Sequence, residues 1–140
     1  MRLLITDPLT IVADLRDVVS VRAEDMSGGF GIWPGHAEVL TVLAVSVVGW
    51  RHADGRQRFC AVRRGILTVS RGQEVAIATR QAVLGDDLAR LEHDVLARFR
   101  ADAEAERIER VAAMRLHLQA IRQIVHCLQP ARSLDGEIGT

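Results

Sequence analysis

The apolar positions of the chain follow two different periods, and the period changes near residue 85. Up to Leu84, short runs rich in valine and isoleucine alternate with turn residues such as Asp7-Pro8, Pro34-Gly35 and Asp54-Gly55. Runs bounded in this way are typical of short strands. The pattern predicts strands over Leu3–Ile5, Ile11–Leu15, Val18–Ala23, Phe30–Trp33, Leu43–Trp50, Phe59–Val62, Ile66–Val69 and Val75–Thr79.

The connections between these runs indicate how the strands pair. Two successive parallel strands need a long crossover connection, usually a helix, and no helical pattern separates the runs. We therefore expect residues 1–84 to form an antiparallel β-sandwich or barrel.

From Asp86 onward the pattern becomes helical. Glycine and proline are absent from Asp86 to Gln129, and apolar residues recur at alternating steps of three and four in two stretches. The stretches consist of Leu84, Leu88, Leu91 and Val95, and of Val111, Met114, Leu118, Ile121, Val125 and Leu128. Gly85-Asp86-Asp87 supplies an N-cap and first-turn acids, and Pro130 is expected to end the helix.

The sequence leaves the shape of this helical half open. Between Arg98 and Arg110 the apolar stripe is lost among charged residues, and no residue there enforces a turn. A two-helix hairpin and one extended helix both fit. We expect a β-sandwich domain over residues 1–84, a helical domain over 85–130 and a flexible tail over 131–140.

Composition and charge exclude several classes of protein. The 18 basic residues, all arginine, balance 18 acidic ones, so the chain has no global attraction to nucleic acid or anionic lipid. Its longest uncharged run, Val39–Trp50, is shorter than the roughly twenty apolar residues of a membrane-spanning helix. Asp7 and Pro8 come too early for a signal peptide. We expect a soluble chain in which Cys60 and Cys127 are two buried thiols.

No constellation of residues indicates catalysis. The five histidines do not pair with cysteines or acids at metal-ligand spacing. His117 and His126 share the predicted helix but project in different directions. No nucleophile elbow, phosphate loop or His-Glu-x-x-His motif occurs, and Asp86-Asp87 suits first-turn carboxylates that complement the helix dipole. The sequence predicts no catalytic residue, no metal site and no cofactor.

The most distinctive segment, Ser27 to Ala37, reads Ser-Gly-Gly-Phe-Gly-Ile-Trp-Pro-Gly-His-Ala. A phosphate-binding loop would continue into a helix that carries lysine and serine or threonine, and none follows. By its residues alone, the segment predicts a strand flanked by tight turns. Its glycines would take positive φ, and Phe30 or Trp33 would enter the core.

This segment resembles the signature Gly-x-Leu-Gly-Ile-x-Pro-Gly-His-Ala of the epsilon subunits of F-type ATP synthases, with Phe30 at the leucine position. Glu38–Thr41 matches the continuation of the signature, and Gly65–Val69 resembles the family's Gly-Ile-Leu-x-Val strand. The resemblance extends over residues 2–128 and is strongest over 21–90. Val21–Asp25 is most similar to the alternate, N-type branch of these ATPases.

The resemblance implies a ten-stranded β-sandwich followed by a helical hairpin. It implies a non-catalytic rotor subunit of the central stalk, peripheral at the cytoplasmic face of the bacterial inner membrane. Such a subunit couples rotation between the catalytic head and the c-ring during ATP synthesis and proton or sodium transport, and its helices inhibit ATP hydrolysis. The alternative is a freestanding β-sandwich adaptor whose terminal amphipathic helix binds an unrelated protein.

The resemblance also assigns residues to partners. Those expected on the c-ring side are Ser27, Gly28, Gly29 and Phe30. In the family an acid that faces an arginine of the ring usually stands at the position of Gly29, and Glu24 and Asp25 are the nearest acids here. His36 matches the family's histidine near the gamma subunit; a histidine that caps the turn Ala37–Leu40 is the alternative.

The last part of the helical half is basic. No acid occurs from Val111 to Leu134, where Arg115, Arg122 and Arg132 remain. Basic amphipathic helices bind acidic surfaces, and the resemblance implies that the target is an acidic segment of the catalytic beta subunit. An ordinary solvated face is the alternative.

Some family members bind ATP through Ile-Asp-x-x-Arg-Ala at the start of the helices. Asp87 and Arg90 match the Asp and Arg of this motif, while Asp86 and Leu91 replace its isoleucine and alanine. We expect weak ATP binding or none.

Overall fold

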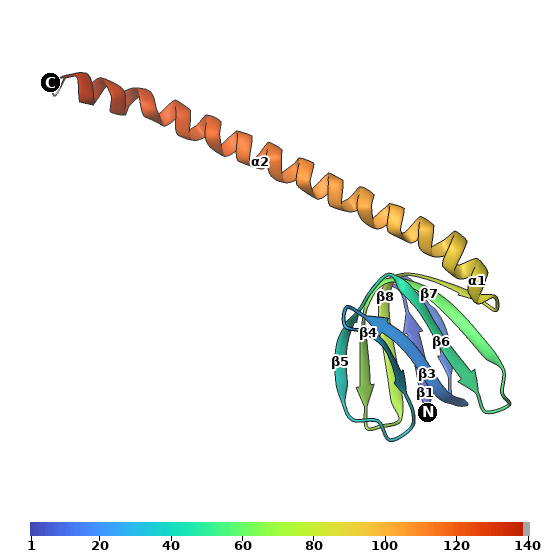
Figure 1. Ribbon diagram of the computed structural model, residues 1–140. Helices are drawn as coiled ribbons and strands as arrows, with labels where there is room; N and C mark the ends of the chain where they lie inside the picture. The colour runs from blue at the N-terminus through green and yellow to red at the C-terminus, as the bar shows by residue number, and fades with distance from the viewer. Residues whose placement is uncertain (139–140) are drawn as a thin grey trace. The chain divides into compact units, whose positions relative to one another are not determined.

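The computed structural model describes the backbone of residues 1–138 and the side chains of residues 1–128. Eight strands come first: β1 (Arg2–Thr6), β2 (Ile11–Leu15), β3 (Val18–Asp25), β4 (Gly28–Ile32), β5 (Val39–Leu43), β6 (Ser46–His52), β7 (Gln57–Ser70) and β8 (Glu74–Gly85). The short helix α1 (Leu88–Arg90), the π-helical turn η1 (Leu91–Val95) and the long helix α2 (Leu96–Ile138) follow (Figure 1). The predicted order, a β-sandwich and then helix, is confirmed.

The long strands β7 and β8 take part in both layers of the sandwich. β7 pairs with β6 over Gln57–Val62 and with β5 over Gly65–Val69. β8 follows β7, and its first half also pairs with β1. One layer has the order β2-β1-β8-β7-β5, and the other contains β7, β6, β3 and β4. The resemblance implied ten strands; the described residues form eight, because β7 and β8 each continue through the bend between the layers.

The bend in β7 lies at Arg64 and Gly65. Arg64 adopts a positive φ of 54°. A Cβ atom at position 65 would lie 2.5 Å from the carbonyl oxygen of Ala78, so only glycine fits there. The hydroxyl of Thr79 lies 2.5 Å from the carbonyl oxygen of Arg64 and closes the bend.

Two strand predictions were wrong in their extent. The predicted strand Leu43–Trp50 begins too early, because Leu43 is the last residue of β5, which was not predicted, and β6 begins only at Ser46. Between them the chain leaves one layer at Ala44, whose amide donates to the carbonyl of Glu24 at 3.2 Å. The predicted strands Phe59–Val62 and Ile66–Val69 are one strand, β7, because pairing with β8 resumes directly after the bend. An apolar run does not reveal which strand its residues will pair with.

The prediction of antiparallel pairing alone was also wrong. β1 and β8 pair in parallel, with Leu3 opposite Val75. The strands between them provide the long connection that parallel neighbours require, so no crossover helix is needed.

The core lies between the two layers and is built from alternate positions along each strand. Its buried residues are Leu3, Ile5, Val18, Val21, Ala23, Ile32, Leu43, Val48, Trp50, Cys60, Val62, Leu67, Val69, Val75 and Ile77. Burial raises the pKa of the Cys60 thiol to about 12. The expectation of two buried thiols was wrong for Cys127, which is exposed on α2 because no described part of that unit packs over the helix.

The N-cap of the first helix is Asp87, one of the three residues that the sequence offered for this role. The expectation of first-turn carboxylates at Asp86 and Asp87 was wrong, because both residues precede the first turn. The Asp87 carboxylate accepts the amide hydrogens of Ala89 at 3.0 Å and Arg90 at 3.4 Å. Such caps satisfy backbone donors that have no partner within the helix.

The first helical turns pack on the sandwich. Leu91, Leu96 and Phe99 are buried there with Ala61, against Val45, Val47 and Phe59. The predicted apolar stripe was wrong at Leu84 and Leu88, which are each 39% exposed. The π-helical turn widens one turn of the helix, so Leu96 rather than Val95 lies fully buried on the face that begins with Leu91.

The chain divides into two compact units, Met1–Asp102 and Ala103–Thr140, so the first helical turns belong with the sandwich. α2 continues past Pro130, which was expected to end it; proline removes one backbone donor, but a helix can continue beyond it. The tail predicted over residues 131–140 lies outside the residues whose side chains are described. Within the described residues, no helix has an apolar stretch long enough to cross a membrane.

Candidate functional site

The residues assigned to the c-ring side lie at the tip and in the second strand of the β3–β4 hairpin. Asp25 orders the tip, because its carboxylate accepts the amide of Ser27 at 2.8 Å, the Ser27 hydroxyl at 2.5 Å and the Thr41 hydroxyl at 2.8 Å. These bonds, led by that from the Ser27 hydroxyl, lower the pKa of the Asp25 carboxyl. Gly28 has a φ of +120°, which favours glycine, and Met26 is 96% exposed. The tip is a fixed, exposed turn.

Gly29 lies directly opposite Glu24 in the β3–β4 ladder. Opposite residues project from the same face of a sheet, with Cβ atoms about 4.5–5.5 Å apart. Glu24 is exposed, and its carboxylate has no ion pair or hydrogen bond to a described residue. Asp25, in contrast, is engaged by Ser27 and Thr41. Of the two acids near Gly29, Glu24 is therefore the one on its face and free to interact.

The two aromatic residues of this segment, Phe30 and Trp33, differ in burial. Phe30 is partly buried against the core, whereas Trp33 is 57% exposed. Phe30 is thus the residue that enters the core, and Trp33 remains at the surface.

His36 lies in the turn that follows β4. Its Nδ1 is 2.8 Å from the carbonyl oxygen of Ala37, and its amide donates to the carbonyl of Trp33 at 3.1 Å. The turn packs on the β7–β8 hairpin, where the amide of Gly35 donates to the carbonyl of Gly72 at 2.8 Å. The His36 ring therefore engages its own turn through Nδ1, and Nε2 has no described partner.

An exposed apolar surface, which was not predicted from the sequence, covers the outer face of β5 and β7. Leu40, Val42 and Ile66 are 72%, 58% and 47% exposed, and Val42 lies opposite Ile66. We call these three residues the apolar strip. Val39–Leu43 is apolar at four of its five positions, a pattern typical of strands covered on both faces. That pattern is the signal from which the strip could have been predicted.

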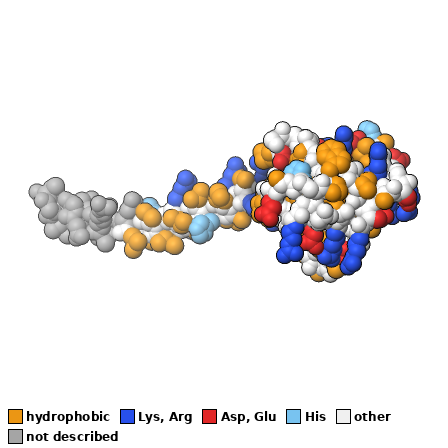
Figure 2. Space-filling view, turned by 90° about the horizontal axis from the view of Figure 1, so that it is seen from below, with side chains coloured by type: hydrophobic (Ala, Val, Ile, Leu, Met, Phe, Trp, Pro, Cys, Tyr) orange, Lys and Arg blue, Asp and Glu red, His pale blue; other side chains and the backbone are white. Residues whose placement is uncertain are grey.

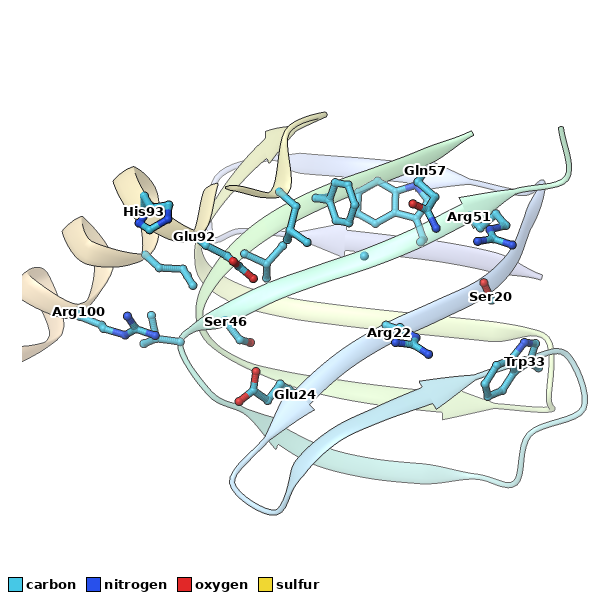
Figure 3. Close-up of a pocket in the computed structure, with 17 residues that line it drawn as sticks. Ser20, Arg22, Glu24, Trp33, Ser46, Arg51, Gln57, Glu92, His93 and Arg100 are labelled. Carbon is cyan, nitrogen blue, oxygen red and sulfur yellow. The ribbon is translucent and has the colours of Figure 1, made fainter. Parts of the chain in front are cut away.

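A shallow groove of about 990 Å³ crosses the outer face of β3 and β6 and reaches the first helical turns (Figure 3). Figure 3 shows Arg22, Arg51, Ser20, Gln57 and Trp33 toward one end, and Glu24, Glu92, His93 and Arg100 toward the helical end. Asp87 and Arg90, the match to half of the ATP motif, do not line this groove. Asp87 is engaged as the N-cap instead.

Arg115 and Arg122 lie on α2, seven residues apart and so on nearly the same side of the helix. Both are exposed, and neither has an ion pair with a described residue. The same helix also exposes apolar side chains (Figure 2). These are Ile108, Val111, Met114, Leu116, Leu118, Ile121, Ile124, Val125 and Leu128. This part of the chain combines exposed apolar area with positive charge.

No metal centre emerges from the described side chains. Within residues 1–128, no three histidine, cysteine, aspartate or glutamate residues gather where they could hold an ion.

Several known proteins similar to this chain are ATP synthase epsilon chains. Residues 1–85 match the family described as ATP synthase, Delta/Epsilon chain, beta-sandwich domain. The chain is 45% identical to ATP synthase epsilon chain 2 of Paraburkholderia xenovorans, over 94% of this chain and 95% of that one. It is 42% identical to ATP synthase epsilon chain 2 of Cereibacter sphaeroides, over 96% and 92%. The similarity therefore includes the helical half.

Solved structures share the fold at lower identity. The Euglena gracilis mitochondrial ATP synthase, solved with OSCP, F1 and c-ring, contains a chain with a TM-score of 0.59 and 22% identity, covering 74% of this chain and 62% of that one. The central stalk and c-ring structure of the Tetrahymena thermophila enzyme contains one with a TM-score of 0.53 and 15% identity, covering 67% and 71%.

Proposed function

The chain belongs to the ATP synthase epsilon-chain family, whose members are non-catalytic subunits of that complex. We propose that it is a subunit of the central stalk at the cytoplasmic face of the bacterial inner membrane. It couples rotation between the catalytic head and the c-ring, which carries protons or sodium ions, and its helical half restrains ATP hydrolysis. The similarity to epsilon chains over nearly the whole length is the observation that carries this proposal.

The tip of the β3–β4 hairpin is the proposed contact with the c-ring. Ser27 to Phe30 include a fixed turn and the exposed position Gly29. Glu24 supplies the acid that family members carry at the position of Gly29, because the two residues are cross-strand partners. The negative charge then remains on the same face of the hairpin, where an arginine of the ring can pair with it.

The apolar strip is the proposed contact with the gamma subunit. Contiguous exposed apolar residues on a soluble domain are typical of protein interfaces. Fully burying one leucine, valine or isoleucine side chain is worth roughly 1.5–3 kcal/mol, so the strip can support a stable association. His36 lies just before β5, which carries Leu40 and Val42, and its free Nε2 offers a polar contact at the edge of the same surface.

The arginines of α2 are proposed to bind the catalytic beta subunit. Arg115 and Arg122 stand on one side of a helix that has no acid from Val111 to Leu128. An acidic segment of the beta subunit would satisfy both charges, and the neighbouring apolar side chains would be covered in the same contact.

Co-purification from cells that contain the complete complex tests this placement. A tagged full-length chain should bring down the gamma subunit and the c-ring. Val42→Glu should reduce recovery of gamma, because it introduces a charge into the apolar strip, whereas Val19→Glu, at a position 39% exposed on β3, should not. A freestanding adaptor would recover neither partner, and that result would refute the proposal.

A further inference from the structure

Two glycines flank Arg22 in the sheet, and each accommodates an aromatic ring. Arg22 of β3 lies opposite Gly31 of β4 on one side and Gly49 of β6 on the other. A Cβ atom at Gly31 would lie 2.8 Å from the ring of Trp33, and one at Gly49 would lie 3.1 Å from the ring of Phe59. Glycine at both positions lets the two rings lie close to the sheet on either side of the arginine.

A second arginine stands diagonally beside the first. Arg51 of β6 lies opposite Ser20 of β3 and Gln57 of β7, one row of the sheet away from Arg22 and on the same face. Both arginines are exposed, and neither has an ion pair with a described carboxylate. This end of the groove (Figure 3) therefore gathers positive charge with the hydroxyl of Ser20 and the amide of Gln57 as further donors.

We propose that Arg22 and Arg51 bind a small organic oxyanion, a phosphate or carboxylate attached to a planar ring that packs on Trp33. Guanidinium groups form paired, charge-assisted hydrogen bonds with such oxyanions. Trp33 is 57% exposed and presents an aromatic surface on which a ring can stack.

Two features of the groove, its volume and the position of its acids, favour a small anion as its occupant. Its volume of about 990 Å³ lies within the range of small-molecule sites. The two acids that line it, Glu24 and Glu92, lie toward the helical end in Figure 3, so they leave the two arginines available to an anion. The site is separate from Asp87 and Arg90, which do not line the groove.

The binding test uses AMP as the probe. Inorganic phosphate and adenosine, which each represent one half of AMP, are the comparison ligands. Calorimetry on the full-length chain should show that AMP binds more tightly than either half and that salt weakens the binding. Arg22→Gln and Arg51→Gln should each weaken AMP binding by about tenfold, while the matched control Arg90→Gln should leave it unchanged. AMP should also change the emission of Trp33, and Trp33→Phe should remove that change.

Three results would overturn the proposal. One is the absence of both heat and an emission change with AMP at millimolar concentration. Another is loss of binding in Arg90→Gln, which would locate the ligand at the start of the helix. The third is equal affinity for AMP and inorganic phosphate, which would mean that no ring is recognised. Circular dichroism of each variant checks that a loss of binding is not a loss of fold.

Discussion

The carboxylate of Asp17 lies 3.0 Å from Nδ1 of His52, a histidine that is only 5% exposed. The other ring nitrogen, Nε2, lies 3.3 Å from the indole nitrogen of Trp50, which can only donate. His52 therefore carries its proton on Nδ1 and donates it to Asp17. The hydrogen bond between His52 and Asp17 connects the turn before β3 with the end of β6, where the hairpin to β7 begins.

Asp17→Asn should destabilise the chain at neutral pH, and the effect should fade in acid. The hydrogen bond from His52 lowers the pKa of the Asp17 carboxyl below its usual 3.8. The contact therefore stabilises the folded state above that pH, and the stabilisation is lost as pH falls through the folded-state pKa. In urea unfolding, the difference between wild type and Asp17→Asn should shrink below about pH 4. Asp102→Asn is the control, and a difference independent of pH would contradict a contact that depends on the ionised Asp17 carboxylate.

Gly29→Arg should leave the sandwich folded but weaken recovery of the c-ring. The nearest atom to a Cβ at position 29 is the Ala23 carbonyl oxygen at 3.9 Å, so a side chain fits, but an arginine there would repel an arginine of the ring. Gly28→Ala is the contrasting variant, because its φ of +120° should cost about 1–3 kcal/mol of stability. Thermal unfolding and co-purification measure the two effects. If Gly29→Arg unfolds the chain, Gly29 matters for the backbone and the interface claim loses its support.

Residues 1–84 should fold alone as an all-β unit, and residues 1–102 should be more stable. The longer fragment keeps Leu91, Leu96 and Phe99 packed over Ala61. Phe99→Ala in the longer fragment should cost about 3–5 kcal/mol, the usual range for a buried phenylalanine. Circular dichroism and urea unfolding of both fragments provide the measurement. Equal stability of the two fragments would show that the helical turns do not stabilise the sandwich.

Sequence pattern predicted the features that depend on local chemistry. Alternation located most strands, and Asp87 was recognised as part of an N-cap because the residue type and the following helical pattern identify it. Pattern did not predict the long course of β7, because Arg63, Arg64 and Gly65 interrupt the apolar run, and the strand continues past them only through its pairing with β8 on both sides of the bend. It also did not predict that Leu96 is fully buried, since a π-helical turn has no sequence signal of comparable strength.

The candidate interaction surfaces also include features that the sequence indicates and features that depend on strand pairing. The residues proposed to contact the c-ring were found from a motif, but the relation of Glu24 to Gly29 needed the register of the β3–β4 ladder. The apolar pattern of Val39–Leu43 could have indicated the β5 part of the apolar strip. The place of Ile66 in the strip could not be predicted, because Val42 and Ile66 become neighbours only through the pairing of β5 with β7.

Reversing the charge of Arg115 and Arg122 should raise ATP hydrolysis by the assembled complex, because it should relieve part of the inhibition. Arg115→Glu with Arg122→Glu replaces attraction by repulsion where an acidic partner is proposed. Exposed ion pairs are worth only about 0.2–1 kcal/mol each, so inhibition should be relieved in part, and added salt should act in the same direction. Arg16→Glu with Arg98→Glu makes the same change of charge elsewhere and should leave hydrolysis unchanged. Equal activation by both pairs would point to a general effect of charge.

Truncation after Asp102 tests the regulatory role most directly. The cut retains the unit Met1–Asp102 with its apolar strip and β3–β4 hairpin and removes the rest of α2. The measurement is ATP hydrolysis by the purified complex, with gamma and c-ring content determined in the same preparation. The predicted result is undiminished gamma and c-ring together with faster hydrolysis than in the complex with the full-length chain. An unchanged rate in a fully assembled complex would contradict the inhibitory role of the helix.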